Sequence, residues 1–211
     1  MASKGEQAER RAHWQQVHQR QRPDEVSWFQ SECQLSLEVI CGLGLDAAAP
    51  VIDVGGGGSR LVDGLLERGF TDLAVLDVSE AALQHSRERL GERASQVSWI
   101  AADVLEAELG GPLQLWHDRA VFHFLTEPAE RERYSAQMRN ALAAGGHALV
   151  ATFAEDGPTK CSGLDVMRYS PPQLQRQLGG DLLELVDARR EIHVTPQGRE
   201  QRFQYSLLRK R

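Results

Sequence analysis

The amino-acid sequence predicts a single α/β domain in which strands alternate with helices. The chain has 211 residues, which is long enough to bury one sizeable core. Residues 51–54 form a short apolar segment that runs into four glycines, and apolar residues then recur at helical spacing over 61–66. Further short apolar segments and helical patterns follow, and the chain closes on two strand patterns around a glycine-containing turn. This order is typical of a sheet covered by helices.

The glycine-rich turn after residue 54 predicts a ligand-binding crevice. Glycine has no Cβ, so a ligand can lie close to the backbone, and open α/β sheets bind ligands beyond the carboxyl ends of their strands. The dinucleotide pattern G-x-G-x-x-G fails because Arg60 occupies the third glycine position, and no lysine of a Walker A loop lies nearby. The pattern that fits is acid-x-Gly-x-Gly, formed by Asp53, Gly55 and Gly57. A tight turn without a ligand is the alternative.

Acidic residues also follow the next two predicted strands. Asp77 follows the strand predicted over 73–76 and stands 20 residues beyond Gly57, a separation that places an acid beside a bound ribose. A carboxylate accepts hydrogen bonds from both ribose hydroxyls at once. Asp103 follows the strand predicted over 97–100. For Asp77 the alternative is a plain neighbour of the N-cap of the next helix.

Together these residues resemble the cofactor motifs of the class I S-adenosylmethionine (SAM) methyltransferases, with the glycine turn as motif I. The resemblance covers roughly residues 10–211. It implies SAM as cofactor and S-adenosylhomocysteine (SAH) as product. It also implies that Asp77 holds the ribose, that Asp103 accepts from the adenine amine, and that Val78 lies against the adenine. The cofactor-binding residues expected from it are Trp14, Trp28, Asp53, Gly55, Gly57, Asp77, Val78, Asp103 and Val104.

The same resemblance implies a Rossmann-like sheet of seven strands in the order 3-2-1-4-5-7-6, with strand seven antiparallel and helices on both faces. Past the fourth strand we expect a helix over 126–143 that Thr126 caps, a strand over 146–153 and a loop over 154–170. A short helix at Pro171-Pro172 and a hairpin over 182–208 complete the chain. Nicotinamide dehydrogenase domains do not generally end in such a hairpin.

The N-terminal segment is expected to cover the cofactor. We expect residues 1–12 to be disordered or frayed, and a helix over 10–21 to carry Trp14 on its apolar stripe. A polar connector with Trp28 and Phe29 follows, and in several SAM methyltransferase families such an aromatic-bearing segment closes over the cofactor. Packing under a loop is the alternative for the two aromatic residues. The chain is therefore divided into a helix and lid segment, 1–30, and a methyltransferase domain, 31–211.

The end of the fourth predicted strand, 113–116, faces the transferable methyl group in this family. His117 and Asp118 come next, and we expect them to position the acceptor first and to handle its proton second. The stretch resembles the Asp-Lys-Gly segment of protein lysine methyltransferases, with Arg119 and Ala120 replacing lysine and glycine. A plain polar turn is the alternative. Expected substrate-binding residues are Phe29, His123 and Arg168, and His123 also suits a hydrogen-bonded packing role.

Composition and cysteine usage narrow the function further. Residues 23–180 hold 12 basic and 23 acidic residues, and such an acidic body argues against nucleic-acid binding. The three cysteines show no metal-ligand spacing, so no metal is expected, and Cys161 is interpreted as incidental rather than reactive. No apolar run approaches about 18 residues and there is no signal peptide, so we expect a cytoplasmic protein without a membrane segment.

The expected reaction is direct in-line transfer of the sulfonium methyl group to a nitrogen, oxygen or sulfur nucleophile of a small molecule. The leaving group is a neutral thioether, so alignment of the two reactants is the main requirement. A protein lysine is the alternative acceptor, since the acidic central segment suits an ammonium group. From other functional classes, the alternatives are a nicotinamide-dependent reductase and a non-catalytic SAM-binding protein.

Overall fold

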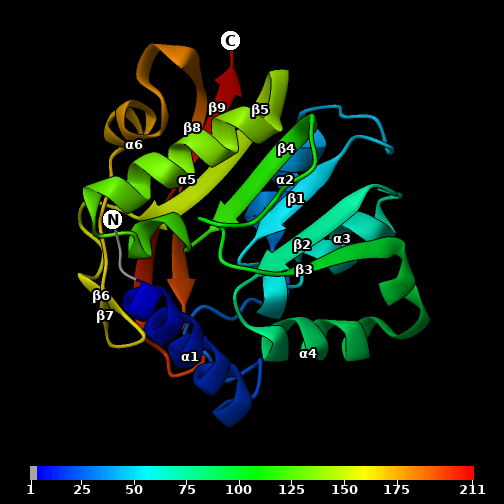
Figure 1. The fold of residues 1–211 in the computed structure, drawn as a ribbon, viewed down its shortest axis with the longest axis vertical. Helices are drawn as coiled ribbons and strands as arrows, with labels where there is room; N and C mark the ends of the chain where they lie inside the picture. Colours follow the sequence, from blue (N-terminus) through cyan, green and yellow to red (C-terminus); the bar gives the residue numbers. More distant parts are fainter. Residues whose placement is uncertain (1–3) are drawn as a thin grey trace.

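The computed structural model describes residues 4–211 and contains a seven-stranded mixed sheet (Figure 1). Its strand order is β3-β2-β1-β4-β5-β9-β8, in which β1 to β5 are parallel and β9 is antiparallel to both neighbours. With β8 and β9 counted as the sixth and seventh strands, the predicted order and the antiparallel seventh strand are confirmed. The strands of this sheet are β1 Val51–Val54, β2 Leu73–Asp77, β3 Val97–Ala101, β4 Leu113–Arg119, β5 Leu142–Phe153, β8 Leu183–Val194 and β9 Glu200–Lys210.

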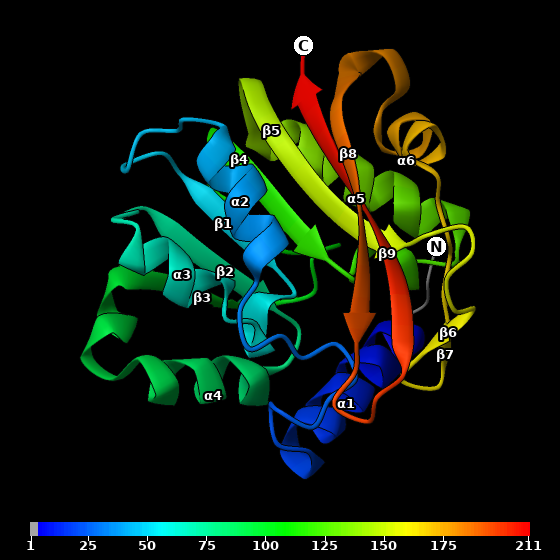
Figure 2. The same ribbon diagram turned by 180° about the vertical axis from the view of Figure 1, so that it is seen from behind.

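Helices cover both faces of the sheet, as predicted (Figures 1 and 2). On one face, Leu37 of α2, Leu65 of α3 and Leu83 of α4 belong to a single buried apolar cluster. On the other face, Tyr134 of α5 and Leu174 of α6 belong to a second cluster. The helices are α1 Lys4–Arg20, α2 Gln34–Gly42, α3 Leu61–Glu67, α4 Glu80–Leu90, α5 Pro128–Ala141 and α6 Pro171–Leu178.

Alternation along the central strands decides which face each side chain meets. In β1, Val51 belongs to the cluster with α2 and α3, whereas Ile52 and Val54 belong to the cluster with α5. By the same period of two, Asp53 points toward the α2 and α3 face. The parallel register sets Asp53 beside His117 of β4. The two polar residues therefore share one face, in the middle of the sheet.

The N-terminal helix is longer than the sequence predicted. Because α1 begins at Lys4, the expectation of frayed chain is wrong for residues 4–12, while residues 1–3 lie outside the described part of the chain. Arg10 explains the difference, since its guanidinium bonds two carboxylates of the main domain. Such long-range contacts leave no periodic signal in the sequence.

Strand β4 also extends beyond the predicted end at Trp116 and runs to Arg119. The alternative of a plain polar turn is therefore wrong. Both neighbouring strands continue alongside: Val54 of β1 and Val150 of β5 each pair with Asp118. His117 and Asp118 are consequently buried strand residues that point to opposite faces of the sheet.

Two connections differ in detail from the prediction. The segment expected as a loop over 154–170 contains a small hairpin of β6 Lys160–Cys161 and β7 Leu164–Asp165, which lies beside α1 in Figures 1 and 2. Helix α5 begins at Pro128 rather than at Thr126, because proline suits the first helical position. Within residues 4–211, no helix combines the length and the apolar composition that a membrane crossing requires.

Candidate cofactor site

A cavity lies at the carboxyl ends of β1 to β4, and α1 covers it (Figure 1). This is the crevice in which open α/β sheets bind their ligands. Residues that follow all four strands contribute to its wall, and Trp14 and Trp28 contribute from the N-terminal segment. Of the cofactor-binding residues predicted from the sequence, Trp14, Trp28, Gly55, Asp77, Val78, Asp103 and Val104 line this cavity, whereas Asp53 and Gly57 do not.

The turn after β1 requires glycine because the backbone passes close to other groups. Gly55 has a φ of 72°, in the left-handed region, and a Cβ there would lie 2.1 Å from the side chain of Val121. A Cβ on Gly57 would lie 2.7 Å from the carboxylate of Asp77. Gly57 thus supports the site from behind, although it does not line the cavity.

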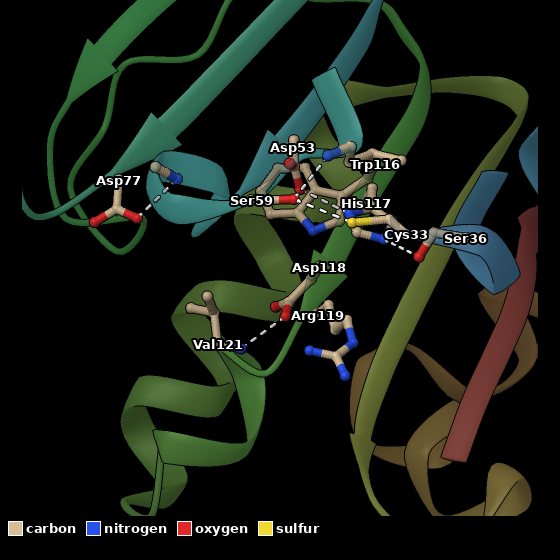
Figure 3. A network of polar contacts seen from close by, with 12 residues as sticks. Cys33, Ser36, Asp53, Ser59, Asp77, Trp116, His117, Asp118, Arg119 and Val121 are labelled. Carbon is tan, nitrogen blue, oxygen red and sulfur yellow. Dashed lines mark hydrogen bonds and ion pairs between the residues drawn. The ribbon is translucent and has the colours of Figure 1, made fainter. Parts of the chain in front are cut away.

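Asp77 is a buried carboxylate on the cavity wall, and Figure 3 shows it bonded to the glycine turn. Its two oxygens accept from the backbone amides of Gly57 at 3.0 Å and Ser79 at 2.8 Å. Burial raises the pKa of Asp77 to about 6, and the two amides oppose that rise. The group is therefore ionised at neutral pH, and each oxygen keeps a lone pair for a ligand.

Asp103 also lines this cavity, but α1 already uses one of its oxygens. Arg10 donates to Asp103 Oδ2 at 2.8 Å and to Glu130 at 2.8 Å, which ties α1 to the end of β3 and to α5. The backbone amide of Leu105 donates to Asp103 Oδ1 at 2.9 Å. Gln15 adds a second anchor, because its Oε1 accepts from the amide of Ala81 at 3.2 Å.

Aromatic side chains close the cavity beneath α1. The ring centroid of Trp14 lies 5.6 Å from that of Trp28 and 4.9 Å from that of Phe124, and all three rings line the cavity. His18 packs against Trp28 at 5.9 Å. Burial lowers the pKa of His18 to about 4, so this imidazole is neutral at physiological pH. Trp14 and Trp28 thus lie where the sequence predicts an aromatic cover.

Asp53 and His117 form a buried pair behind the glycine turn, which Figure 3 shows together with Ser36. His117 Nδ1 lies 2.7 Å from Asp53 Oδ1, and His117 Nε2 lies 2.9 Å from the hydroxyl of Ser36 on α2. All three residues are at most 3% exposed and none lines the cavity. The pair therefore joins β1, β4 and α2 inside the protein instead of facing a ligand.

Asp118 is likewise engaged by the protein itself. Tyr134 donates to its Oδ2, and the backbone amides of Val121 and Phe122 donate at 2.8 and 3.0 Å. Figure 3 shows the bond from Val121. Burial raises the pKa of Asp118 to about 6, against these hydrogen bonds. Ala120 has a left-handed φ of 72°, and this sharp turn brings the two amides back onto the carboxylate. Asp118 does not line the cavity.

Of His117, Asp118 and Arg119, only Arg119 lines the cavity. Its guanidinium donates to the hydroxyl of Tyr205 at 2.8 Å, to the carbonyl of Trp28 at 3.1 Å and to Glu191 at 3.2 Å. It also lies over the ring of Phe203, 4.2 Å from the centroid. Arg119 thus connects β4 to the terminal hairpin and to the segment that carries Trp28.

Known proteins share this fold. The Burkholderia thailandensis 1,6-didemethyltoxoflavin-N1-methyltransferase, solved with 1,6-didemethyltoxoflavin and SAH, has a TM-score of 0.75 and 21% identity, over 100% of this chain and 91% of that one. The N-methyltransferase NodS of Bradyrhizobium japonicum WM9, solved with SAH, has a TM-score of 0.66 and 17% identity, over 93% and 97%. Residues 51–146 match the family model described as a methyltransferase domain. The chain therefore has the fold of these SAM-dependent methyltransferases, and its residues 51–146 are similar to a methyltransferase domain.

Two curated relatives of this chain have names that state different methyl acceptors. The malonyl-(acyl-carrier protein) O-methyltransferase of Anoxybacillus flavithermus is 30% identical over 84 residues, which are 40% of this chain and 30% of the relative. The eEF1A lysine and N-terminal methyltransferase of Bos taurus is 24% identical over 153 residues, 68% of this chain and 21% of the relative. The chain therefore spans less than a third of the length of either relative.

The fold keeps the three predicted substrate-binding residues away from the cavity. Phe29 packs under the guanidinium of Arg60, 5.7 Å from the ring centroid. His123 is fully buried, burial lowers its pKa to about 3, and its Nδ1 faces the amide of Phe153. Arg168 is exposed. The packing interpretation of Phe29 and His123 fits these contacts better than a role in binding substrate.

Among the residues of the cavity wall that sequence reasoning missed, four have polar or charged side chains: Arg10, His18, Arg119 and Cys161. Arg10 lies in the segment that was expected to be frayed, and an arginine on a polar helix normally faces solvent. The position of His18 on the Trp14 stripe was the one available signal for its burial. Among residues 4–211, no three His, Cys, Asp or Glu side chains are grouped as metal ligands.

Proposed function

We propose that the chain transfers the methyl group of SAM to a nitrogen, oxygen or sulfur nucleophile of a small molecule. The observation that supports the cofactor most directly is Asp77, a buried carboxylate held by the glycine turn on the cavity wall. Two adjacent ribose hydroxyls match such an acceptor pair.

The rest of the cavity suits the other parts of SAM. Val78 and Val104 offer apolar surface to the adenine ring, and Asp103 offers a carboxylate oxygen to its exocyclic amine. Gly55 leaves the backbone open on the side of the methionyl part. Asp53 and Gly57 act from behind, since they fix the shape of the turn without reaching the cavity.

The cavity is smaller than its cofactor requires. Its volume is about 100 Å³, whereas sites for small molecules usually measure roughly 300–1,000 Å³. Helix α1 and Trp28 form the cover, and the ion pairs of Arg10 hold α1 down. We therefore propose that α1 moves outward when SAM enters and that the structure represents the closed arrangement.

Catalysis in this arrangement depends on alignment. Bound SAM supplies a methyl group on a positively charged sulfur, and the residues of this chain fix its direction and exclude water. Alignment contributes roughly 7–11 kcal/mol to a bimolecular step, which exceeds the 10²–10⁴-fold effect typical of general-base catalysis. Asp53, His117 and Asp118 act as positioning residues, because they fix the ends of β1 and β4. Direct contact of His117 or Asp118 with the acceptor finds no support in their burial.

A small-molecule acceptor is favoured because segments of the protein itself border the cofactor cavity and the cavity beside it: α1, the β6–β7 hairpin and the turn between β8 and β9. The toxoflavin-type relative, which this chain matches along its full length, also carries a small molecule in its structure. A protein lysine remains the second candidate, since the alignment to the eEF1A methyltransferase extends over 68% of the chain.

Two experiments test the proposal. Calorimetric titration of the wild-type protein with SAH is expected to show binding, and titration with NADH is expected to show none. Tight NADH binding without SAH binding would establish the reductase alternative. Incubation with methyl-labelled SAM, a metabolite extract and lysate protein then identifies the acceptor class. We expect label in the small-molecule fraction; label on lysine overturns this preference, and SAH binding without any transfer indicates a non-catalytic protein.

A further inference from the structure

A second cavity adjoins the cofactor cavity and shares the side chains of Trp28 and Cys161 with it. Its volume is about 520 Å³. Three segments that are distant in the sequence enclose it: the connector after α1, the β6–β7 hairpin, and the turn between β8 and β9. A molecule bound here lies next to the wall of the cofactor cavity, on the side of Trp28.

Uncharged hydrogen-bonding groups dominate this second cavity. Three carboxamides, of Gln21, Gln197 and Gln201, line it together with the hydroxyls of Ser27 and Ser162. The charged residues of the wall balance each other, because Glu25 and Glu200 are matched by Lys160 and Arg199. An alkylammonium group therefore meets no excess of negative charge, and an anion meets no excess of positive charge.

Gln201 marks the place where a ligand would complete the wall. Gln201 is 8% exposed, and its Oε1 has no hydrogen-bond partner within the described residues. A buried acceptor without a partner is unfavourable, because it has lost its hydrogen bond to water. A ligand N–H removes this cost once the amide turns toward the cavity. Carboxamides pair well with ring edges that offer a donor beside an acceptor, as they do with nucleobases.

We propose that the second cavity binds the methyl acceptor and that the acceptor is an uncharged heterocycle with a lactam edge, a ring N–H beside a carbonyl. This inference rests on the proposed function and adds the substrate class to it. The aromatic face of Trp28 stacks on the ring, and Gln201 accepts from the N–H edge. Reaction requires Trp28 and Cys161 to part, since they separate the two cavities.

The methyl transfer balances without a further reagent. A nitrogen lone pair of the acceptor forms the N–CH₃ bond while the electron pair of the S–CH₃ bond returns to sulfur. The proton of that nitrogen passes to water, so the methylated product is neutral. Cys161 does not compete as a nucleophile, because burial raises the pKa of its thiol and keeps it protonated.

The test uses lumazine (pteridine-2,4-dione) as the probe, with butylammonium and benzoate for comparison. Calorimetry with SAH present measures the affinity of each probe for the wild-type protein and for Gln201→Met, which keeps the length of the side chain and removes the amide. Gln84→Met is the matched control, because Gln84 is exposed on α4 and lines neither cavity. Gln21→Met, at an exposed position of the wall, repeats the test without burial.

We expect lumazine to bind more tightly than both comparison probes, and Gln201→Met to weaken lumazine about tenfold. Gln21→Met should weaken it about threefold, while Gln84→Met and the SAH affinity of all variants stay unchanged. Absence of SAH binding by the wild-type protein would refute the proposed function itself. Two results overturn the acceptor inference alone while SAH still binds. One is tighter binding of butylammonium than of lumazine. The other is a lumazine affinity that is the same in Gln201→Met and Gln21→Met.

Discussion

Four acidic residues stand at strand ends on one edge of the sheet, and they divide into two pairs with different surroundings. Asp77 and Asp103 line the cofactor cavity. Asp53 and Asp118 are 3% and 0% exposed, and their hydrogen-bond partners are other buried groups of the protein. The sequence presents all four alike, as an acid that follows an apolar strand. The comparison shows that position within the sheet, and not residue type, separates a ligand-binding acid from a structural one.

The physical reason lies in the neighbours of each strand. β1 and β4 are adjacent central strands, so the side chains at their ends meet each other and the helices on either face. Asp53 meets His117 across the register, and Asp118 meets Tyr134 of α5. β2 and β3 lie nearer to the edge of the sheet, and the cavity covered by α1 lies at their carboxyl ends. Their acids are therefore left to face a ligand.

The largest expected effect concerns the structural pair. Asp118→Ala leaves three buried donors without their acceptor: the hydroxyl of Tyr134 and the amides of Val121 and Phe122. Each buried donor without a partner costs about 1–3 kcal/mol, and removal of a buried charge offsets part of the total. We expect the free energy of unfolding in urea at pH 8 to fall by about 2–4 kcal/mol. The SAH affinity of the folded fraction should stay within about twofold of wild type.

Asp72→Ala is the control for that substitution, because Asp72 is exposed and its side chain makes no hydrogen bond or ion pair within residues 4–211. The unfolding free energy of this variant should change by less than about 0.5 kcal/mol. A stable Asp118→Ala protein with a greatly reduced kcat contradicts the structural assignment. That result would return Asp118 to the acceptor-positioning role expected from the sequence.

The second prediction concerns the cavity-lining pair. Asp77→Ala removes a charge-assisted acceptor from the ribose, a loss of about 1.5–3 kcal/mol. We expect SAH to bind about tenfold to a hundredfold more weakly, as measured by calorimetry. Asp53→Asn, which retains a hydrogen-bonding side chain next to His117, should change SAH affinity much less. Equal losses in the two variants would remove the distinction between the pairs.

The fold could be predicted almost completely, since it depends on patterns that are local in sequence. The glycine turn at 55–58, the acid at Asp77 and the terminal hairpin each leave a periodic or spaced signal. The roles of His117 and Asp118 could not be predicted, because their partners lie on other elements. Ser36, 81 positions from His117, lies on α2. A polar tripeptide after an apolar strand looks like a turn until those partners are known.

The pH dependence of cofactor binding sharpens the comparison further. Burial raises the pKa of Asp77 to about 6, so the carboxylate gains a proton, and loses an acceptor for the ribose, as the pH falls through that value. SAH affinity should therefore be constant above about pH 7 and about tenfold weaker at pH 5. Asp77→Asn should bind weakly with little change between pH 5 and pH 8. An unchanged wild-type affinity across this range contradicts the assignment of Asp77 to the ribose.

The smallest effect is expected at Arg10, which connects the cavity-lining pair to the cover. Arg10 bonds Asp103 and Glu130, and both ion pairs are only partly exposed. If α1 must move outward to admit SAM, these two ion pairs must break, and they therefore raise the free-energy barrier to opening. Arg10→Gln should then accelerate association and dissociation of SAH alike, each about threefold, because a partly exposed ion pair contributes less than about 1 kcal/mol.

The affinity of SAH should stay within about twofold in that variant, since the closed site keeps Asp77 and both aromatic covers. Stopped-flow measurement of the two rate constants checks this, with Arg11→Gln as the matched control at an exposed position of the same helix. Faster dissociation without faster association indicates that Arg10 holds the ligand and not the cover. In that case Asp103 and Arg10 bind the adenine together, and three residues, Asp77, Asp103 and Arg10, hold the ligand in place of the cavity-lining pair.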